Sequence, residues 1–212
     1  YLEVARKFGI RTGDPLVYEN EVLFVPRFDR KVSEGRVERL GMHSLCAIAN
    51  IAEFGAAVPH DIFCRALAKV VVDPVQELQE YIRRDILNLA LRNTDNHGRN
   101  TAVLRTIGQI RLSPLFDFAP MFLDPEGIGR VSRWENEQPG SQPEWAEICE
   151  KLKNFMDPVA TRSWLASLGE DIKRLPETMQ DCHVDDAIIE RLTGWIDEVA
   201  AGLAAARPRM QI

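Results

Sequence analysis

The segment from residue 74 to residue 91 constrains the fold most, because it combines the hydrophobic spacing of a long amphipathic helix with a strong start signal. Asp73 is placed to cap this helix, Pro74 suits its first position, and Gln76 is placed like a capping-box partner. Apolar residues then recur at helical spacing, which predicts one buried stripe and a solvated, charged opposite face. The stripe is Val75, Leu78, Ile82, Ile86 and Leu89, and the charged residues are Glu77, Glu80, Arg83 and Arg84.

Helical patterns dominate the chain after residue 40, whereas its beginning is mixed. Residues 1–9 read as the end of a helix that stops at Gly9, and residues 16–25 as a hairpin whose three-residue connection has Asn20 at its centre. The fold class that follows is α+β, mostly α. The further helices are expected at 40–53, 61–71, 74–91, 143–155, 158–174 and 185–205.

Composition excludes several classes of protein. The 212 residues are 45% hydrophobic and 27% charged, as in soluble globular proteins, and no apolar run approaches the roughly 20 residues of a membrane helix. A net charge of -6 without a dense Lys/Arg run disfavours direct nucleic-acid binding. Four scattered cysteines without a CxxC pair suggest reduced thiols in a cytoplasmic protein. The chain begins without a signal peptide or an initiator Met, as if it started part-way through a gene.

A polar string at 93–100, Asn-Thr-Asp-Asn-His-Gly-Arg-Asn, breaks the helical pattern. Two strand-like segments follow within 101–112, and Asp117 comes soon after them. The hairpin should fold the chain back, so that Asp95 and Asn100 lie beside Asp117. The Pro-, Gly- and charge-rich stretch 123–143 is expected to be a long mobile loop that borders this unit.

Oxygen donors in this arrangement suit a magnesium–nucleotide site. Mg²⁺ takes one or two carboxylates from protein and completes its octahedron with water and phosphate oxygens. An Asp five residues before a metal-binding Asn is how protein kinases place the base for phosphoryl transfer. Asp95 would accept the proton of the attacking hydroxyl, Asn100 and Asp117 would hold the metal, and His97 would contact a phosphate or fix the loop.

Two other interpretations apply to the same residues. The polar string is also good turn chemistry, since Asn and Asp cap and Gly permits positive φ. The position of Asp117 between Phe116 and Phe118 favours a functional role, because a carboxylate beside aromatic residues needs a partner. Glycoside hydrolysis by Asp95 and Asp117 would require carboxyl groups roughly 5 to 9 Å apart beside a sugar groove, which no other sequence feature supports.

These motifs resemble the HipA-like serine/threonine kinases, the toxin half of bacterial toxin–antitoxin pairs and distant members of the protein-kinase-like superfamily. The similarity covers nearly the whole chain. It is carried by residues 2–10, 25–30, 93–100 and 113–117, of which the last two segments are specific in combination. The loop D-x-H-x-x-N also looks like those of lipid kinases and antibiotic phosphotransferases.

The resemblance implies a role for each matching position. Asp95 matches the catalytic base, Asn100 and Asp117 match the magnesium ligands, and His97 matches a residue near the phosphates of ATP. Backbone groups around Pro26 and Phe28 match the hinge that meets adenine. The implied partners are a protein substrate, phosphorylated on Ser or Thr, and a helix-turn-helix antitoxin. Three charged residues after the hinge read better as a structural ion-pair cluster than as catalytic groups: Arg27, Asp29 and Arg30.

The chain departs from the family in its N-terminal lobe. The phosphate-covering loop and the strand Lys of these kinases are missing, since Lys7 lies on a helix and Lys31 follows the hinge. We expect a remnant of the N-lobe and the hinge at 1–30 and a helical, protein-kinase-like C-lobe at 31–212. A small-molecule phosphotransferase and a non-catalytic binding or regulatory module remain alternatives. The substrate, autophosphorylation and oligomeric state do not follow from the sequence.

Overall fold

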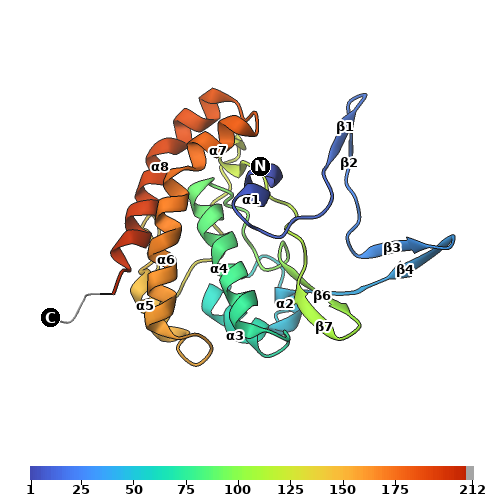
Figure 1. Ribbon diagram of the computed structural model, residues 1–212, viewed down its shortest axis with the longest axis horizontal. Helices are drawn as coiled ribbons and strands as arrows, with labels where there is room; N and C mark the ends of the chain where they lie inside the picture. The colour runs from blue at the N-terminus through green and yellow to red at the C-terminus, as the bar shows by residue number, and fades with distance from the viewer. Residues whose placement is uncertain (209–212) are drawn as a thin grey trace.

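Helix α4 (Pro74–Ala90) forms where the sequence predicts a helix, and it runs through the centre of the protein (Figure 1). In the computed structural model, which describes residues 1–208, the Asp73 carboxylate accepts a hydrogen bond from the backbone N–H of Gln76 at 3.0 Å. This bond satisfies a donor that the first turn of a helix leaves free. Leu78, Ile82 and Ile86 are fully buried, which confirms most of the predicted stripe, although Val75 in the first turn is 44% exposed.

The other helices surround α4. Helix α8 packs against both α6 and α4, and the three helices can be followed in Figure 1. Gly169 permits the close approach of α6 and α8, because a Cβ at that position would lie 3.0 Å from the backbone oxygen of Ala200. The remaining helices are α1 (Leu2–Lys7), α2 (Leu45–Ile48), α3 (His60–Ala68), α5 (Trp145–Lys151), α6 (Pro158–Lys173), α7 (Leu175–Asp181) and α8 (Asp186–Ala205), with a 3₁₀ turn at Met121–Leu123.

Strands form three small antiparallel sheets. Two are two-stranded ribbons that project from the helical body (Figure 1), and the third is a three-stranded sheet against α4. With the helices, these sheets confirm the predicted α+β, mostly α fold. The ribbons are β1 (Val17–Glu19) with β2 (Val22–Phe24) and β3 (Arg30–Ser33) with β4 (Arg36–Arg39), and the third sheet is β5 (Gly41–Ser44), β6 (Ala102–Thr106) and β7 (Gln109–Leu112).

Two local predictions were wrong, and one helix was not predicted. The helix expected at 40–53 is strand β5 followed by the short helix α2, because residues 41–44 pair with β6. The first hairpin turns through two residues with positive φ, Asn20 and Glu21, rather than three, since Glu19 pairs with Val22. Helix α7 was not predicted as a separate element.

The charged face of α4 is buried rather than solvated, which corrects the sequence-based expectation. Glu77, Glu80 and Arg84 are 2%, 8% and 3% exposed. The Glu77 carboxylate accepts two hydrogen bonds from the Arg11 guanidinium, and that of Glu80 pairs with Arg84 at 2.7 Å. These ion pairs join α4 to the segment after α1 and to the exit of β7, where Arg84 donates to the carbonyl of Ser113.

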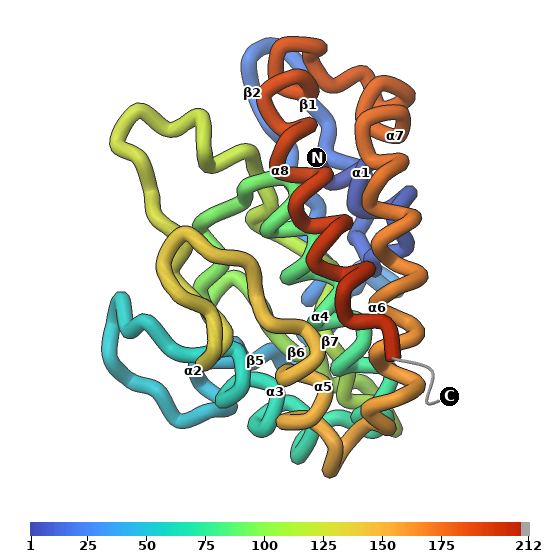
Figure 2. Tube along the Cα trace, turned by 90° about the vertical axis from the view of Figure 1, so that its left-hand side faces the viewer, coloured from blue at the N-terminus to red at the C-terminus, as the bar shows by residue number. Residues whose placement is uncertain are grey.

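The connection from residue 113 to residue 144 contains only a 3₁₀ turn, which confirms the loop expected at 123–143, but part of this connection is packed into the protein. Figure 2 shows it as the yellow-green and yellow loops beside α4 and α8. It carries the buried residues Ser132, Trp134 and Glu137, at 1%, 2% and 7% exposure. A segment with a buried tryptophan contributes to the core instead of moving over it.

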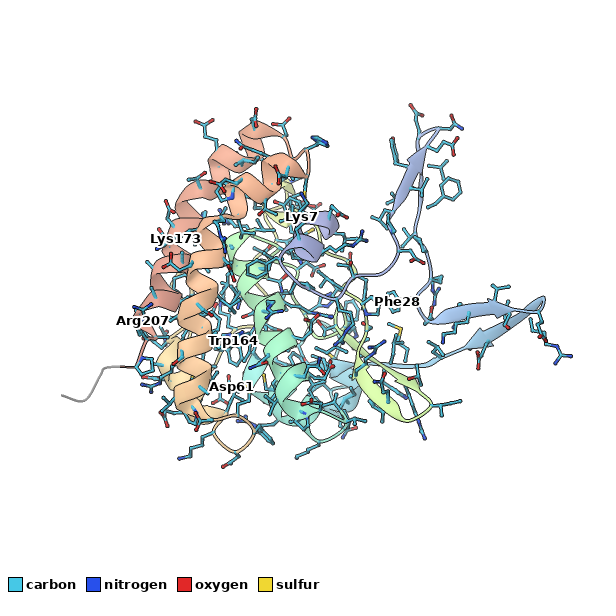
Figure 3. The ribbon with its side chains drawn as sticks, viewed as in Figure 1. Lys7, Phe28, Asp61, Trp164, Lys173 and Arg207 are labelled. Carbon is cyan, nitrogen blue, oxygen red and sulfur yellow. The ribbon has the colours of Figure 1, made fainter. Side chains whose placement is uncertain are left out.

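The two ribbons leave apolar side chains in contact with solvent. Tyr18 on β1 is 71% exposed and Val32 on β3 is 78% exposed. Figure 3 shows Phe28 where the ribbons meet the body. No helix within residues 1–208 is both long enough and apolar enough to cross a bilayer. The cysteines are unpaired, as expected, and Cys46, Cys64 and Cys149 are buried.

Candidate active site

The polar loop after α4 brings Asp95 and Asn100 together. The Asn100 side-chain amide donates to the Asp95 carboxylate at 3.3 Å and to the Asp95 carbonyl at 3.1 Å. The loop is tight because the backbone N–H of Asn100 donates to the carbonyl of His97, while the Gly98 carbonyl accepts from the N–H of Cys46. Gly98 is required here: an added Cβ would lie 2.3 Å from the ring of buried Phe63.

His97 lies beside Asp95 rather than apart from it. Its Nε2 atom is 3.4 Å from Asp95 Oδ1, and both side chains are about one-third exposed, at 34% and 29%. The sequence suggests two roles for His97, contact with a phosphate or fixing of the loop, and this placement favours the second. Arg99 turns away, donates to the carbonyls of Ala52 and Glu53, and covers the ring of Phe54.

The β6–β7 hairpin returns the chain toward the same end of the sheet. Beyond the paired strands, the Ser113 N–H donates to the Ala102 carbonyl at 2.8 Å, close in sequence to Asn100. Asp117 follows with a left-handed φ of 54°, a strained conformation for a residue other than glycine. Its side chain is exposed, Phe118 is buried, and the Phe116 ring lies 5.6 Å from that of Phe28.

The oxygen atoms of this loop and of the hairpin exit are of the kind that Mg²⁺ binds. Asn100 uses its amide nitrogen on Asp95, which leaves its side-chain oxygen as an acceptor. The exposed Asp117 carboxylate makes no hydrogen bond or ion pair to another part of residues 1–208. Within that range no group of three or more His, Cys, Asp or Glu side chains could hold a metal ion. Magnesium needs fewer protein carboxylates than such a group supplies.

At the expected hinge, Pro26 and Phe28 are half-buried. Phe28 lies between the ribbons and the body (Figure 3). The charged residues around them form the predicted ion-pair cluster, because the Asp29 carboxylate lies 2.7 Å from the guanidinium groups of both Arg27 and Arg30. The hydrogen bond from Arg27 lowers the pKa of Asp29. Asp29 therefore has a structural role in fixing the backbone after the hinge.

Sequence reasoning missed Asn96, the neighbour of the candidate base. Its side-chain oxygen accepts from the backbone N–H groups of Val131 and Ser132, both at 3.1 Å, and its amide donates to the Ser132 carbonyl at 2.9 Å. Asn96 is 9% exposed. It therefore fastens the polar loop to the connection that follows the hairpin.

A buried charge network lies behind Asn96. Arg130 donates two hydrogen bonds to Asp85 and pairs with Glu137 at 2.8 Å, while His60 contacts Asp85 at 3.1 Å and Asn96 at 3.2 Å. The sequence contained one signal for it. Asp85 falls three residues after Ile82 and four before Leu89, on the apolar stripe of α4, where a carboxylate requires a counter-charge.

Electrostatics keep this network charged. Burial alone would raise the pKa of the Asp85 carboxyl, but the charges of Arg130 and His60 and their hydrogen bonds outweigh it and hold that pKa well below its ordinary value. Burial would likewise lower the pKa of Arg130, which Asp85 and Glu137 instead raise. The network is thus an ionic clamp between α4 and the connection.

Comparison with known proteins gives three matches. Residues 1–179 match the family model of the HipA-like C-terminal domain. A protein of Sinorhizobium fredii described as "Putative kinase Y4mE" is 25% identical over an alignment of 195 positions, and the match covers 84% of this chain and 44% of that protein. A chain of the Shewanella oneidensis MR-1 toxin–antitoxin complex of HipA, HipB and operator DNA superposes with a TM-score of 0.64 at 17% identity, covering 97% of this chain and 53% of that one.

Two further points follow from these matches. The chain spans about half the length of these relatives. The expectation that it does not contact nucleic acid directly is not supported, since the solved complex contains operator DNA. The family match covers most of the chain, and the fold is kinase-like. Together these findings establish the family of this chain. This chain belongs to the HipA-like C-terminal domain family.

Proposed function

We propose that this chain carries the catalytic loop of an ATP- and Mg²⁺-dependent kinase that phosphorylates Ser or Thr of a cytosolic protein. The observation that carries the proposal is the contact between Asn100 and Asp95. A kinase-like family and fold support it. The free, mostly buried cysteines suit a reducing compartment.

Each residue has a defined task in this mechanism. Asp95 accepts the proton of the substrate hydroxyl as that oxygen attacks the γ-phosphorus, and the bond from the γ-phosphorus to the β,γ-bridging oxygen breaks to release ADP. The Asn100 amide holds the Asp95 carboxylate in position. The Nε2 atom of His97 restrains the other carboxylate oxygen. Asn100 Oδ1 and Asp117 would hold Mg²⁺, which when bound neutralises the phosphate oxygens.

The hinge would hold the nucleotide base. Phe28 packs on Phe116, one residue before Asp117, so the segment expected to meet adenine is coupled to the segment expected to hold the metal. We propose that backbone groups around Pro26 and Phe28 face the adenine edge. Side-chain identity would matter little for this contact.

A helix-turn-helix protein is the proposed partner. Its only support is the solved relative, whose complex contains HipB and operator DNA. Whether this chain also approaches DNA in such an assembly belongs to the same proposal. A complex of this chain with the helix-turn-helix protein and DNA would test it.

The function is tested by incubating the protein with γ-labelled ATP, with and without Mg²⁺, and with cytosolic protein or small hydroxylated acceptors. We expect Mg²⁺-dependent label on Ser or Thr of a protein. Label on the small acceptors alone would identify a phosphotransferase of the same fold. Calorimetric binding of Mg²⁺-ATP without transfer to any acceptor would contradict catalysis and leave a nucleotide-binding regulatory module.

A further inference from the structure

A cavity of about 330 Å³ lies next to the start of the polar loop. It is bounded by the end of α4, by Asn93 and Thr94, by the connection after the hairpin and by Trp195 of α8. Asp95, Asn100 and Asp117 do not line it. Its volume is at the lower end of the range for small-molecule sites.

Arg92 brings a cation to this cavity. Its guanidinium carbon lies 4.5 Å from the centre of the Trp195 ring and 5.8 Å from that of Phe122. Its backbone has a left-handed φ of 52° at the end of α4. The guanidinium forms no hydrogen bond or ion pair with any other residue in the range 1–208, although it can donate five hydrogen bonds.

Two residues that line the cavity also carry a buried side-chain oxygen without a partner. The side-chain oxygen of Asn93 is buried without a hydrogen bond, and Asn93 itself is only 4% exposed. The side-chain oxygen of Gln142 is in the same state. Both residues line the cavity. Buried polar atoms are nearly always hydrogen-bonded, so each of these points to a missing donor.

The positive side chains that line the cavity outnumber the negative ones. Arg130 is matched by Asp85 and Glu137 at 2.9 and 2.8 Å. Arg133 is left 3.8 Å from a Glu137 oxygen that already accepts from Arg130. Arg92 and Arg133 therefore give the cavity an excess of positive charge, which disfavours a metal ion and favours an anion.

We infer that this cavity binds a small molecule that carries an acidic group beside a hydrogen-bond donor, as a free or phosphorylated amino acid does. The acidic group would lie against the Arg92 guanidinium, where a charged partner makes the strongest hydrogen bonds. The donor would satisfy the oxygens of Asn93 and Gln142. Because Thr94 lines the cavity and precedes Asp95, an occupant would contact the base of the polar loop.

Calorimetry with three probes tests the inference: O-phospho-L-serine, L-glutamate and inorganic phosphate. We expect saturable binding of at least one amino acid, and weaker or no binding of inorganic phosphate, which lacks an ammonium donor. Phosphate binding as tight as that of both amino acids would overturn the requirement for a donor. Absence of saturable binding by both amino acids would overturn the site.

Variants locate the binding. Arg92→Gln should weaken it by about tenfold or more, since a charge-assisted hydrogen bond is lost. Arg191→Gln is the matched control, because Arg191 also stacks on Phe122 but does not line the cavity. Binding unchanged in Arg92→Gln, or weakened equally in the control, would place the ligand elsewhere.

Gln142→Met provides an independent variant. It removes an acceptor that has no partner in the protein, so the midpoint of thermal unfolding should not fall while the affinity for the amino acid does. Binding should also change the fluorescence of Trp195, and that change should disappear in Trp195→Phe. An affinity unaffected by Gln142→Met would contradict the proposed donor contact.

Discussion

Arg130 donates two hydrogen bonds of 3.0 and 2.9 Å to Asp85, and the pair joins α4 to a connection 45 residues later in the chain. Asn96 fastens the same connection to the polar loop. The position of Asp95 thus depends on charges that do not touch it. This dependence leads to predictions for stability as well as for activity.

Replacing Asp95 by Asn should lower kcat by about 10² to 10⁴, the usual contribution of a positioned base. The dissociation constant of ATP should stay nearly unchanged. Transfer of labelled phosphate and calorimetric ATP binding measure the two quantities. Asp197→Asn, an exposed carboxylate on α8, is the control. Full activity of the Asp95 variant would remove this residue from the mechanism.

Replacing Asp117 by Asn should act on metal–nucleotide binding itself, because one proposed oxygen ligand loses its charge. We expect the affinity for ATP in the presence of Mg²⁺ to fall toward its value without the metal. The matched control is Glu126→Gln, an exposed carboxylate in the same connection. An unaltered Mg²⁺ dependence would exclude Asp117 as a ligand.

Replacing Arg130 by Met should lower the free energy of unfolding by about 3 to 5 kcal/mol, because Asp85 and Glu137 would remain buried without their counter-charge. Urea denaturation measures the change. Arg133→Met alters a half-exposed neighbour 3.8 Å from Glu137 and should change stability by less than about 0.5 kcal/mol. Equal effects of the two variants would show that the clamp contributes little.

Stability should fall in acid. The pKa of Asp85 is lower in the folded protein than in the unfolded chain, so its contribution is present above the unfolded pKa of about 3.9 and is lost as the pH falls below it. Urea midpoints between pH 7 and pH 2 should therefore decrease most below about pH 4. Asp85→Asn should flatten that decrease, and an identical slope in both proteins would contradict the assignment.

Replacing Gly98 by Ala should cost about 1 to 3 kcal/mol through overpacking, because the new methyl group would overlap the ring of Phe63. The polar loop would shift with it. Gly194→Ala on α8 meets no atom within 4 Å and should stabilise the helix by up to about 1 kcal/mol. Thermal unfolding of both variants checks the prediction, which fails if they respond alike.

The extent to which the sequence predicted this structure depends on how local each feature is. Asp73, Pro74 and the apolar stripe predicted α4 because a cap and a helical period are properties of one segment. The buried partner of Glu77 was not predictable in this way. Arg11 lies 66 positions from Glu77, and only the fold brings the two together.

The candidate site also combines features that depend on one segment with features that depend on the whole fold. The motif of Asp95 and Asn100 is local, and their contact follows from a tight loop. Asn96 is equally close in sequence, yet its function depends on backbone groups 35 and 36 residues away. Strand β5 was mistaken for a helix for the same reason, since pairing with β6 overrides the preference of a four-residue segment.

In the ribbons β1–β2 and β3–β4, each strand pairs along one edge only, and its other edge is unpaired within residues 1–208. A lone two-stranded hairpin is marginally stable in water, and an unpaired edge accepts further strands. Amide hydrogen exchange should therefore be fast in these strands when the chain is alone, and its slowing there would be an early sign that another polypeptide has docked.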